Sequence, residues 1–208
     1  QEIKQIQDKI KKKTITKGEK KKNHYPGLTD SEKNNYLTRQ EELKKAKHHI
    51  NIQFYIFKDD EIGNKIIDIL IDKAQNGVEV RLLYDAVGSR LFSDKSIHKL
   101  KKSGVKVGAF FPSFMKVINF NLNYRNHRKI VVIDGNVGFI GGNNIGDEYL
   151  GKDPKFGYWR DTHLKITGDS VKDLNIRFIL DWRYTTKEDL VLDKYFGVPT
   201  PLASITVR

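Results

Sequence analysis

The chain of 208 residues contains no cysteine and only one methionine. Without cysteine, disulfides and thiolate metal sites are excluded, and the composition fits a reducing compartment. No apolar stretch approaches the roughly 18 residues that a membrane-spanning helix needs, and the N-terminus lacks the apolar segment of a signal peptide. We therefore expect these 208 residues to form a soluble protein fragment.

Positive charge is in clear excess, with a formal net charge of +12 at pH 7, while 38% of the residues are hydrophobic and allow an ordinary core. A field of this sign favours anionic partners, which include nucleic acid, acidic lipid surfaces and phosphorylated substrates. Charge alone does not choose among them. A solvated basic surface that only serves solubility is the simplest alternative.

The first 35 residues differ from the rest because they are rich in lysine and poor in large apolar side chains. A turn at Tyr25-Pro26-Gly27 follows the lysines. We predict a poorly packed basic arm over residues 1–35 and one domain over residues 36–208. Beside an anionic bilayer each such cation would contribute roughly 1 kcal/mol, although a solvated linker explains the composition equally well. The lysines concerned are Lys9, Lys11, Lys12, Lys13, Lys20, Lys21 and Lys22.

Beyond this arm, the hydrophobic pattern alternates between strand-like and helical segments. The order strand–helix–strand–helix–strand in the first half favours parallel pairing with helices packed on the sheet. We therefore predict one α/β domain with a mixed, largely parallel β-sheet flanked by helices and without internal repeats. Predicted strands cover residues 50–57, 78–84, 105–110, 129–133, 137–140 and 163–166, and predicted helices end near residue 47 or cover 62–71, 93–103 and 170–184.

An aromatic segment, residues 110–120, lies between a predicted strand and the polar residues described next. Pro112 interrupts it, and phenylalanine recurs along it. Such a segment either fills the core or forms an apolar lip beside a site, which would suit contact with lipid.

His127 and Lys129 would point to the same face if they begin a buried strand, since side chains alternate along a strand. An ammonium beside an imidazole suits a phosphate, because the cation stabilises charge that develops on the phosphate oxygens. It also favours the neutral, nucleophilic imidazole. Asp134 follows at the predicted end of the same strand, before a turn at Gly135.

A short returning strand then delivers Gly141, Gly142 and Asn144 close to the same place. Paired glycines let backbone N–H groups approach a ligand, and the Asn144 amide adds an uncharged donor. Carboxylates and histidines are too sparse here for a metal-dependent hydrolase. The pattern indicates covalent chemistry without metal or cofactor, in which a histidine attacks phosphorus and an alcohol leaves.

The complete pattern, His127-x-Lys129-x4-Asp134-x6-Gly141-Gly142-x-Asn144, resembles the signature of the phospholipase D superfamily. Its flanking segments look like those of bacterial cardiolipin synthases, and this likeness extends from about residue 45 to residue 185. The segments are 55–60, 80–85, 124–129, 144–151 and 159–164.

The resemblance assigns a role to each motif residue. It implies that His127 is the nucleophile, or the general acid if a second histidine attacks. Lys129 and Asn144 would bind the phosphoryl oxygens. Asp134 would organise the site through hydrogen bonds or ion pairs.

The superfamily also places a downstream acid against the catalytic imidazole, and by position we assign this role to Asp161, with Glu148 as the alternative. A carboxylate there would fix the tautomer of the ring. The residues expected to bind substrate are Gly141, Gly142, Arg125, Arg128 and Glu148.

Members of this superfamily bring together two motifs, and therefore two histidines, whereas this chain carries one. The resemblance thus implies half of an active site. The second half would come from the same parent chain, which the basic start and abrupt end favour, or from a homodimer.

The leading functional hypothesis is cardiolipin synthesis from phosphatidylglycerol at a membrane surface, the bacterial cytoplasmic membrane in the parent protein. A nuclease-like phosphodiesterase acting as a homodimer is the alternative, since nucleic acid also suits the basic charge. A third possibility is a membrane-binding fragment without activity.

Overall fold

The computed structural model describes residues 30–111, 125–157, 159–190, 192–195 and 204–207. The segment predicted as a basic arm therefore lies outside the described residues up to residue 29. The predicted boundary at residues 35 and 36 falls inside the first described helix, α2 (Asp30–Lys45), so helical structure begins before that boundary.

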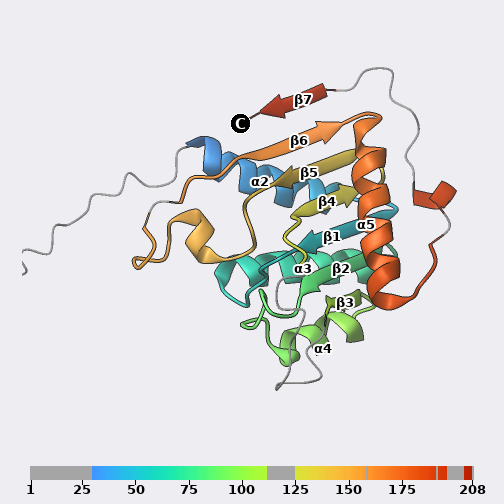
Figure 1. The fold of residues 1–208 in the computed structure, drawn as a ribbon, viewed down its shortest axis with the longest axis horizontal. Coiled ribbons are helices and arrows are strands. Elements are labelled where there is room, and N and C mark those ends of the chain that lie inside the picture. Colours follow the sequence, from blue (N-terminus) through green and yellow to red (C-terminus); the bar gives the residue numbers. More distant parts are fainter. Residues whose placement is uncertain (1–29, 112–124, 158, 191, 196–203, 208) are drawn as a thin grey trace, which may run out of the picture.

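A single seven-stranded sheet forms the centre of the domain, with the order β3-β2-β1-β4-β5-β6-β7 (Figure 1). Strand β1 pairs in parallel with β2, and β2 with β3, whereas the other four pairings are antiparallel. The strands are β1 (His49–Phe54), β2 (Glu79–Asp85), β3 (Lys106–Phe110), β4 (Ile130–Ile133), β5 (Val137–Gly141), β6 (His163–Thr167) and β7 (Ser204–Val207).

The mixed α/β class predicted from the sequence is confirmed, but the expectation of a largely parallel sheet is wrong. Parallel pairing is confined to the first three strands, where helices α3 (Glu61–Gln75) and α4 (Asp94–Lys102) make the crossovers. From β4 onward the sheet continues by antiparallel pairing, and a tight turn joins β4 to β5. Positive φ values at Asp134 (52°) and Gly135 (66°) make this turn possible.

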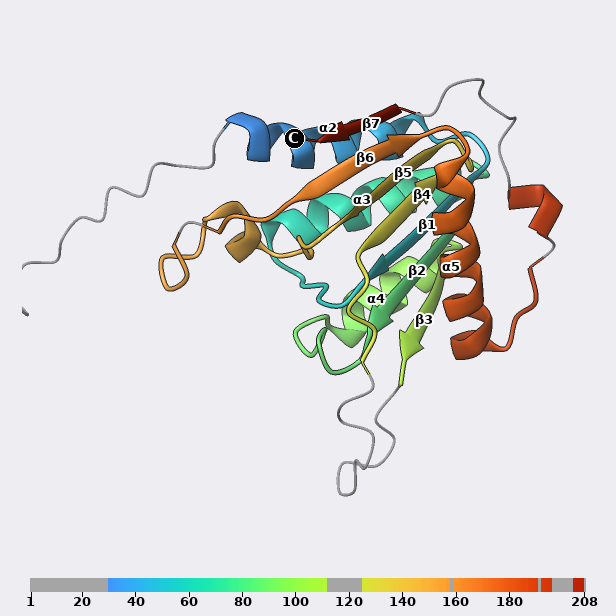
Figure 2. The same cartoon turned by 45° about the horizontal axis from the view of Figure 1, so that its top comes forward.

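Helices cover both faces of the sheet, as Figures 1 and 2 show. On one face, α2, α3 and α4 pack over the larger apolar core, which includes Leu43, Ile66 and Leu100. On the other face, α5 (Ser170–Thr186) contributes Phe178 and Trp182. Because side chains alternate along a strand, Val131 and Ile133 of β4 face the first core while Ile130 and Val132 face α5.

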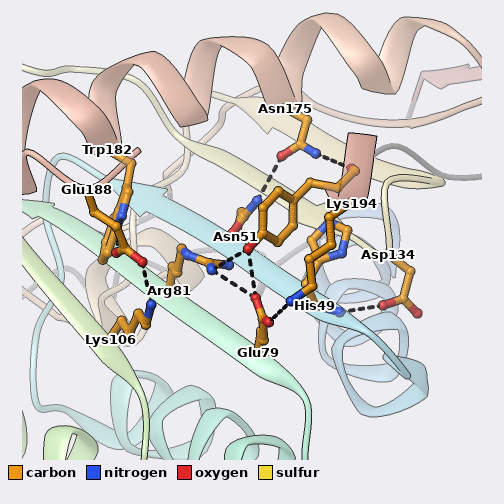
Figure 3. Close-up of polar contacts among 11 residues, drawn as sticks. His49, Asn51, Glu79, Arg81, Lys106, Asp134, Asn175, Trp182, Glu188 and Lys194 are labelled. Atoms are coloured by element: carbon orange, nitrogen blue, oxygen red, sulfur yellow. Dashed lines mark hydrogen bonds and ion pairs between the residues drawn. The ribbon is translucent and has the colours of Figure 1, made fainter. Parts of the chain in front are cut away.

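A buried polar cluster fixes the segment after α5 against the sheet (Figure 3). The short helix η3 (Leu192–Tyr195) ends on Tyr195, whose hydroxyl accepts a hydrogen bond from Arg81 at 2.8 Å and donates one to Glu79 at 2.9 Å. Asn175 of α5 donates to the Tyr195 carbonyl at 2.5 Å. These bonds hold the N-terminal half of β2, at the edge of the sheet opposite the site described below.

Most predicted elements are confirmed within a few residues, because hydrophobic periodicity reports local structure well. Strand β7 and the two short helices η2 (Asp147–Leu150) and η3 were not predicted. The aromatic segment 110–120 lies outside the described residues from residue 112 onward. Among the described helices, none combines the length and apolar character needed to cross a bilayer.

Candidate active site

The candidate site lies where β1 and β2 end, β4 begins, β5 ends and β6 begins. The strand directions bring these five points to one edge of the sheet, since β4 and β6 run against β1 while β5 runs with it. This is the carboxyl edge of the parallel strands, where ligands commonly bind in open α/β sheets.

Tyr55, directly after β1, supports both His127 and Lys129. The His127 ring stacks on the Tyr55 ring with centroids 3.8 Å apart and an interplanar angle of 18°. The Lys129 ammonium lies 5.5 Å from the Tyr55 ring centroid and donates a hydrogen bond of 2.7 Å to the His127 carbonyl. The His127 and Lys129 side chains thus meet one aromatic surface, in agreement with the prediction that they share a face, and His127 itself is exposed.

Partial burial lowers the pKa of the Lys129 ammonium, and the nearby carboxylate of Asp161 acts in the opposite direction. Asp161 therefore belongs to the site, but its electrostatic partner is Lys129. Asp161 accepts a hydrogen bond of 2.7 Å from the Thr162 backbone N–H, and the structure shows none between it and His127. The expected contact of Asp161 with the imidazole is thus not formed here.

The two motif glycines are required because other groups occupy the space that a side chain would need. A Cβ atom on Gly142 would lie 2.0 Å from an Asp161 carboxylate oxygen. A Cβ atom on Gly141 would lie 2.4 Å from Nδ1 of His163. The predicted role of these glycines was close approach to a ligand, whereas the structure shows close approach of β5 to the start of β6.

Asn144 is buried and fixed by two hydrogen bonds. Its Oδ1 accepts from the Ile56 backbone N–H at 3.0 Å, and its Nδ2 donates to the Tyr149 hydroxyl at 2.9 Å. An amide nitrogen has two hydrogens, so one remains for a phosphoryl oxygen. Asn144 therefore links the ends of β1 and β5 and still retains a donor.

Asp134 does not lie with the other motif residues, which corrects the expectation that it organises the site directly. The whole of β4 separates it from Lys129, about 16 Å at the rise of an extended strand. Its carboxylate accepts backbone hydrogen bonds of 2.8–2.9 Å from Lys47, His48 and His49. Asp134 thus fixes the beginning of β1 at the opposite edge of the sheet.

The remaining predicted residues have other surroundings than the His127 ring among the contacts of the described residues. Glu148 is buried and pairs with Lys58 at 2.5 Å, so it stabilises the η2 segment. Arg125 and Arg128 line an open groove of about 550 Å³ on the α5 side, together with Phe110 and Tyr184. Both arginines therefore line the groove beside α5 and not the surface on which His127 and Lys129 meet Tyr55.

Four residues that support the site were not singled out from the sequence. Tyr55 and Tyr149 contact motif side chains, while Asp85 and Asp181 are buried carboxylates that hold the segment before His127. One signal was available for Asp85, because a carboxylate that ends an apolar strand at this edge is unusual for a core.

Comparison with known proteins agrees with this geometry. A family model described as "Cardiolipin synthase, PLD-like domain" matches residues 40–154, which is more than half of the chain. The chain belongs to this cardiolipin synthase, PLD-like domain family. The match covers His127, Lys129, Asp134 and Asn144, and it ends before Asp161.

Relatives of this family share about half of the aligned residues. The chain is 52% identical over 154 residues to a cardiolipin synthase of Oceanobacillus iheyensis, covering 74% of this chain and 32% of that protein. It is 55% identical over 141 residues to the major cardiolipin synthase of Bacillus subtilis, covering 68% of this chain and 29% of that protein. The chain therefore spans about one third of the length of the relatives it matches.

Solved structures show the same PLD-like fold at low sequence identity. A phospholipase D family member, Nuc from Salmonella typhimurium, superposes with a TM-score of 0.51 at 15% identity, covering 72% of this chain and 87% of that chain. The phosphatidylserine synthase of Haemophilus influenzae gives a TM-score of 0.54 at 20% identity, covering 71% of this chain and 34% of that chain.

Proposed function

We propose that this chain supplies one half of an active site that transfers a phosphatidyl group between phosphatidylglycerol molecules, forming cardiolipin and glycerol. The observation that carries the proposal is the placement of His127 and Lys129 on Tyr55, beside Asn144 and Asp161, at one edge of a PLD-like domain. The identity to cardiolipin synthases supports the choice of lipid over other phosphodiesters.

In the proposed first step, a ring nitrogen of His127 attacks the phosphorus of phosphatidylglycerol. A phosphorus–nitrogen bond forms, the bond from phosphorus to the glycerol headgroup breaks, and the leaving oxygen takes a proton from a second histidine. In the second step, a hydroxyl of another phosphatidylglycerol returns its proton to that second histidine and attacks phosphorus. The phosphorus–nitrogen bond breaks and cardiolipin leaves.

Lys129 and Asn144 would hold the non-bridging oxygens during both steps. The partly buried ammonium stabilises the charge that develops on them, and the Asp161 carboxylate opposes the lowering of the Lys129 pKa by burial. The second histidine would come from another PLD-like half, in the parent chain or in a homodimer. The expected surroundings are an anionic membrane surface, the bacterial cytoplasmic membrane in the parent protein.

Labelled phosphatidylglycerol in vesicles tests this function. We expect labelled cardiolipin from the wild-type chain combined with its second half, and none above background from His127→Ala. His98→Ala, which changes an exposed histidine of α4, is the matched control and should leave the rate unchanged. Cardiolipin from the His127 variant at the wild-type rate would refute the site assignment.

A nuclease-like phosphodiesterase acting as a homodimer is the second candidate, and the net charge of +12 favours it. It predicts hydrolysis of single-stranded DNA without added metal, abolished by the same His127→Ala substitution. Hydrolysis of DNA without any lipid transfer would support this alternative.

A further inference from the structure

Asn126, the residue directly before His127, is buried and held from two sides. Its backbone N–H donates to the Asp85 carboxylate at 3.2 Å, at the end of β2. Its side-chain amide donates to the Asp181 carboxylate at 3.1 Å, from α5. Two elements that are distant in sequence, β2 and α5, therefore fix the residue directly before His127.

The Asp181 carboxylate is the centre of this arrangement. One of its oxygens accepts hydrogen bonds from Gln53 at 2.9 Å and Arg128 at 3.1 Å in addition to that from Asn126. Its other oxygen accepts from Arg177, one turn earlier on α5. The carboxylate is thus bonded to the end of β1, to both neighbours of His127 and to its own helix.

Burial makes this carboxylate a rigid anchor. The Asp181 side chain is only 5% exposed, and a buried carboxylate is stable only when charge and hydrogen bonds compensate its lost hydration. Arg128 and Arg177 supply the opposite charge, while Gln53 and Asn126 supply neutral donors. Such a network has little freedom to rearrange without leaving a buried polar group unpaired.

Asp85 connects the same network to the aromatic support of His127. Its other oxygen accepts from the backbone N–H groups of Val87 and Gly88 at 2.9 and 3.0 Å. Gly88 lies against Tyr55, since a Cβ atom on it would approach the Tyr55 ring to 2.8 Å. Ser89 donates to the Tyr55 carbonyl at 3.0 Å. The same set of contacts therefore positions the backbone before His127 and the Tyr55 ring on which His127 stacks.

We infer that Asp181 is a positioning residue for His127, acting through Asn126 to seat the imidazole on Tyr55. Asp181 itself does not contact the imidazole. Its importance for catalysis rests on the proposed function, whereas its effect on the geometry of His127 does not. For a transfer that requires in-line attack, a displacement of about 1 Å lowers the rate by about 100-fold.

The test compares Asp181→Asn with Asp173→Asn, an exposed position on the same helix, by NMR of the histidine rings. The face of Tyr55 shields the His127 ring protons, so the wild-type and Asp173 variant should show them shifted upfield. Asp181→Asn keeps the size of the side chain but removes the charge that Arg128 and Arg177 require. We expect this variant to lose much of the upfield shift of the His127 ring protons.

Asn126→Ala is the second variant, because it removes the link and leaves Asp181 with its other three partners. It also removes the hydrogen bond of 3.2 Å that the Asn126 side-chain oxygen accepts from the Arg128 backbone N–H. We expect the same change at His127 with a smaller loss of stability. Unchanged His127 signals in this folded variant would overturn the inference, even if Asp181→Asn does not fold. In the lipid assay, Asp181→Asn should lower kcat about 100-fold. Absence of transfer by the wild-type chain combined with a second PLD-like half would refute the proposed function. The NMR comparison would still decide whether Asp181 positions His127.

Discussion

Among single side chains, Arg39 of α2 is unusual because it is 2% exposed yet has no acidic partner among the described residues. Its Nε and Nη1 atoms lack hydrogen-bond partners, and its guanidinium lies 5.0 Å from the Tyr36 ring and 5.4 Å from the Phe54 ring. Burial lowers the pKa of this guanidinium. A small cavity of about 10 Å³ beside it is also lined by Asn143 and His163, which carry unpaired buried polar atoms.

Replacing Arg39 by leucine should stabilise the protein by about 2 kcal/mol, because the charge is desolvated without an acidic partner among the described residues. Urea unfolding measures this as a higher midpoint with an unchanged slope. Arg90→Leu, at an exposed position, should change the stability by less than about 0.5 kcal/mol. A destabilised Arg39→Leu variant would show that the charge is compensated in the folded protein.

The buried ring of His163 should make the free energy of unfolding fall as the pH is lowered. Burial, assisted by the Arg39 charge, lowers the pKa of this histidine from 6.5 to about 3. The folded state therefore favours the neutral ring, and the unfolded state binds the proton first as the pH falls. The contribution of His163 is complete above pH 6.5 and is lost progressively from there down to about pH 3.

We expect His163→Gln to flatten the fall in unfolding free energy between pH 6 and 4, by about 1.4 kcal/mol per pH unit for one proton. Some slope should remain, because burial also lowers the pKa of His49 to about 4. His98→Gln is the exposed control. An unchanged slope in His163→Gln would mean that this ring is protonated in the folded state.

At the level of secondary structure elements, Asp134 joins the end of β4 to the start of β1. Asp134→Ala removes the acceptor of three backbone N–H groups and places alanine at φ 52°, so we expect a loss of about 3 kcal/mol. Asp134→Asn keeps one oxygen and tolerates this backbone conformation, so it should lose less. The His127 ring signals should stay unchanged in both variants, and a shift in them would contradict the separation of Asp134 from the site.

The arrangement of helices and strands was largely predictable, because each element up to α5 carries its own periodicity and its own boundary. The end of α3 at Asn76-Gly77 is an example, since Gly77 has a φ of 84°. Strand β7 was not predictable in this way, because four residues carry little pattern and their pairing with β6 is set by the sheet.

The candidate site was predictable for residues that share one strand and less so for residues on separate loops. Alternation placed His127 and Lys129 on one face. The rise of a strand would also have placed Asp134 at the far end, but the motif spacing suggested a single cluster. The partner of Asp161 depends on how the loop before β6 packs, and the role of Asp181 depends on how α5 crosses β1 and β4.

For the whole molecule, two facts decide the account. The chain spans about one third of the length of its relatives, and it carries one histidine–lysine pair of the motif. The proposed chemistry needs one histidine to attack phosphorus and another to protonate the leaving oxygen. Activity should therefore depend on association with a second PLD-like half, whether from another copy or from the parent chain.

Gel filtration with light scattering, followed by the labelled phosphatidylglycerol assay on each fraction, tests this central claim most directly. We predict no labelled cardiolipin from monomeric fractions, and transfer only in fractions that hold two PLD-like halves. His127→Ala should abolish transfer without changing the elution profile. A monomer that forms cardiolipin at the rate of the assembled species would contradict the account.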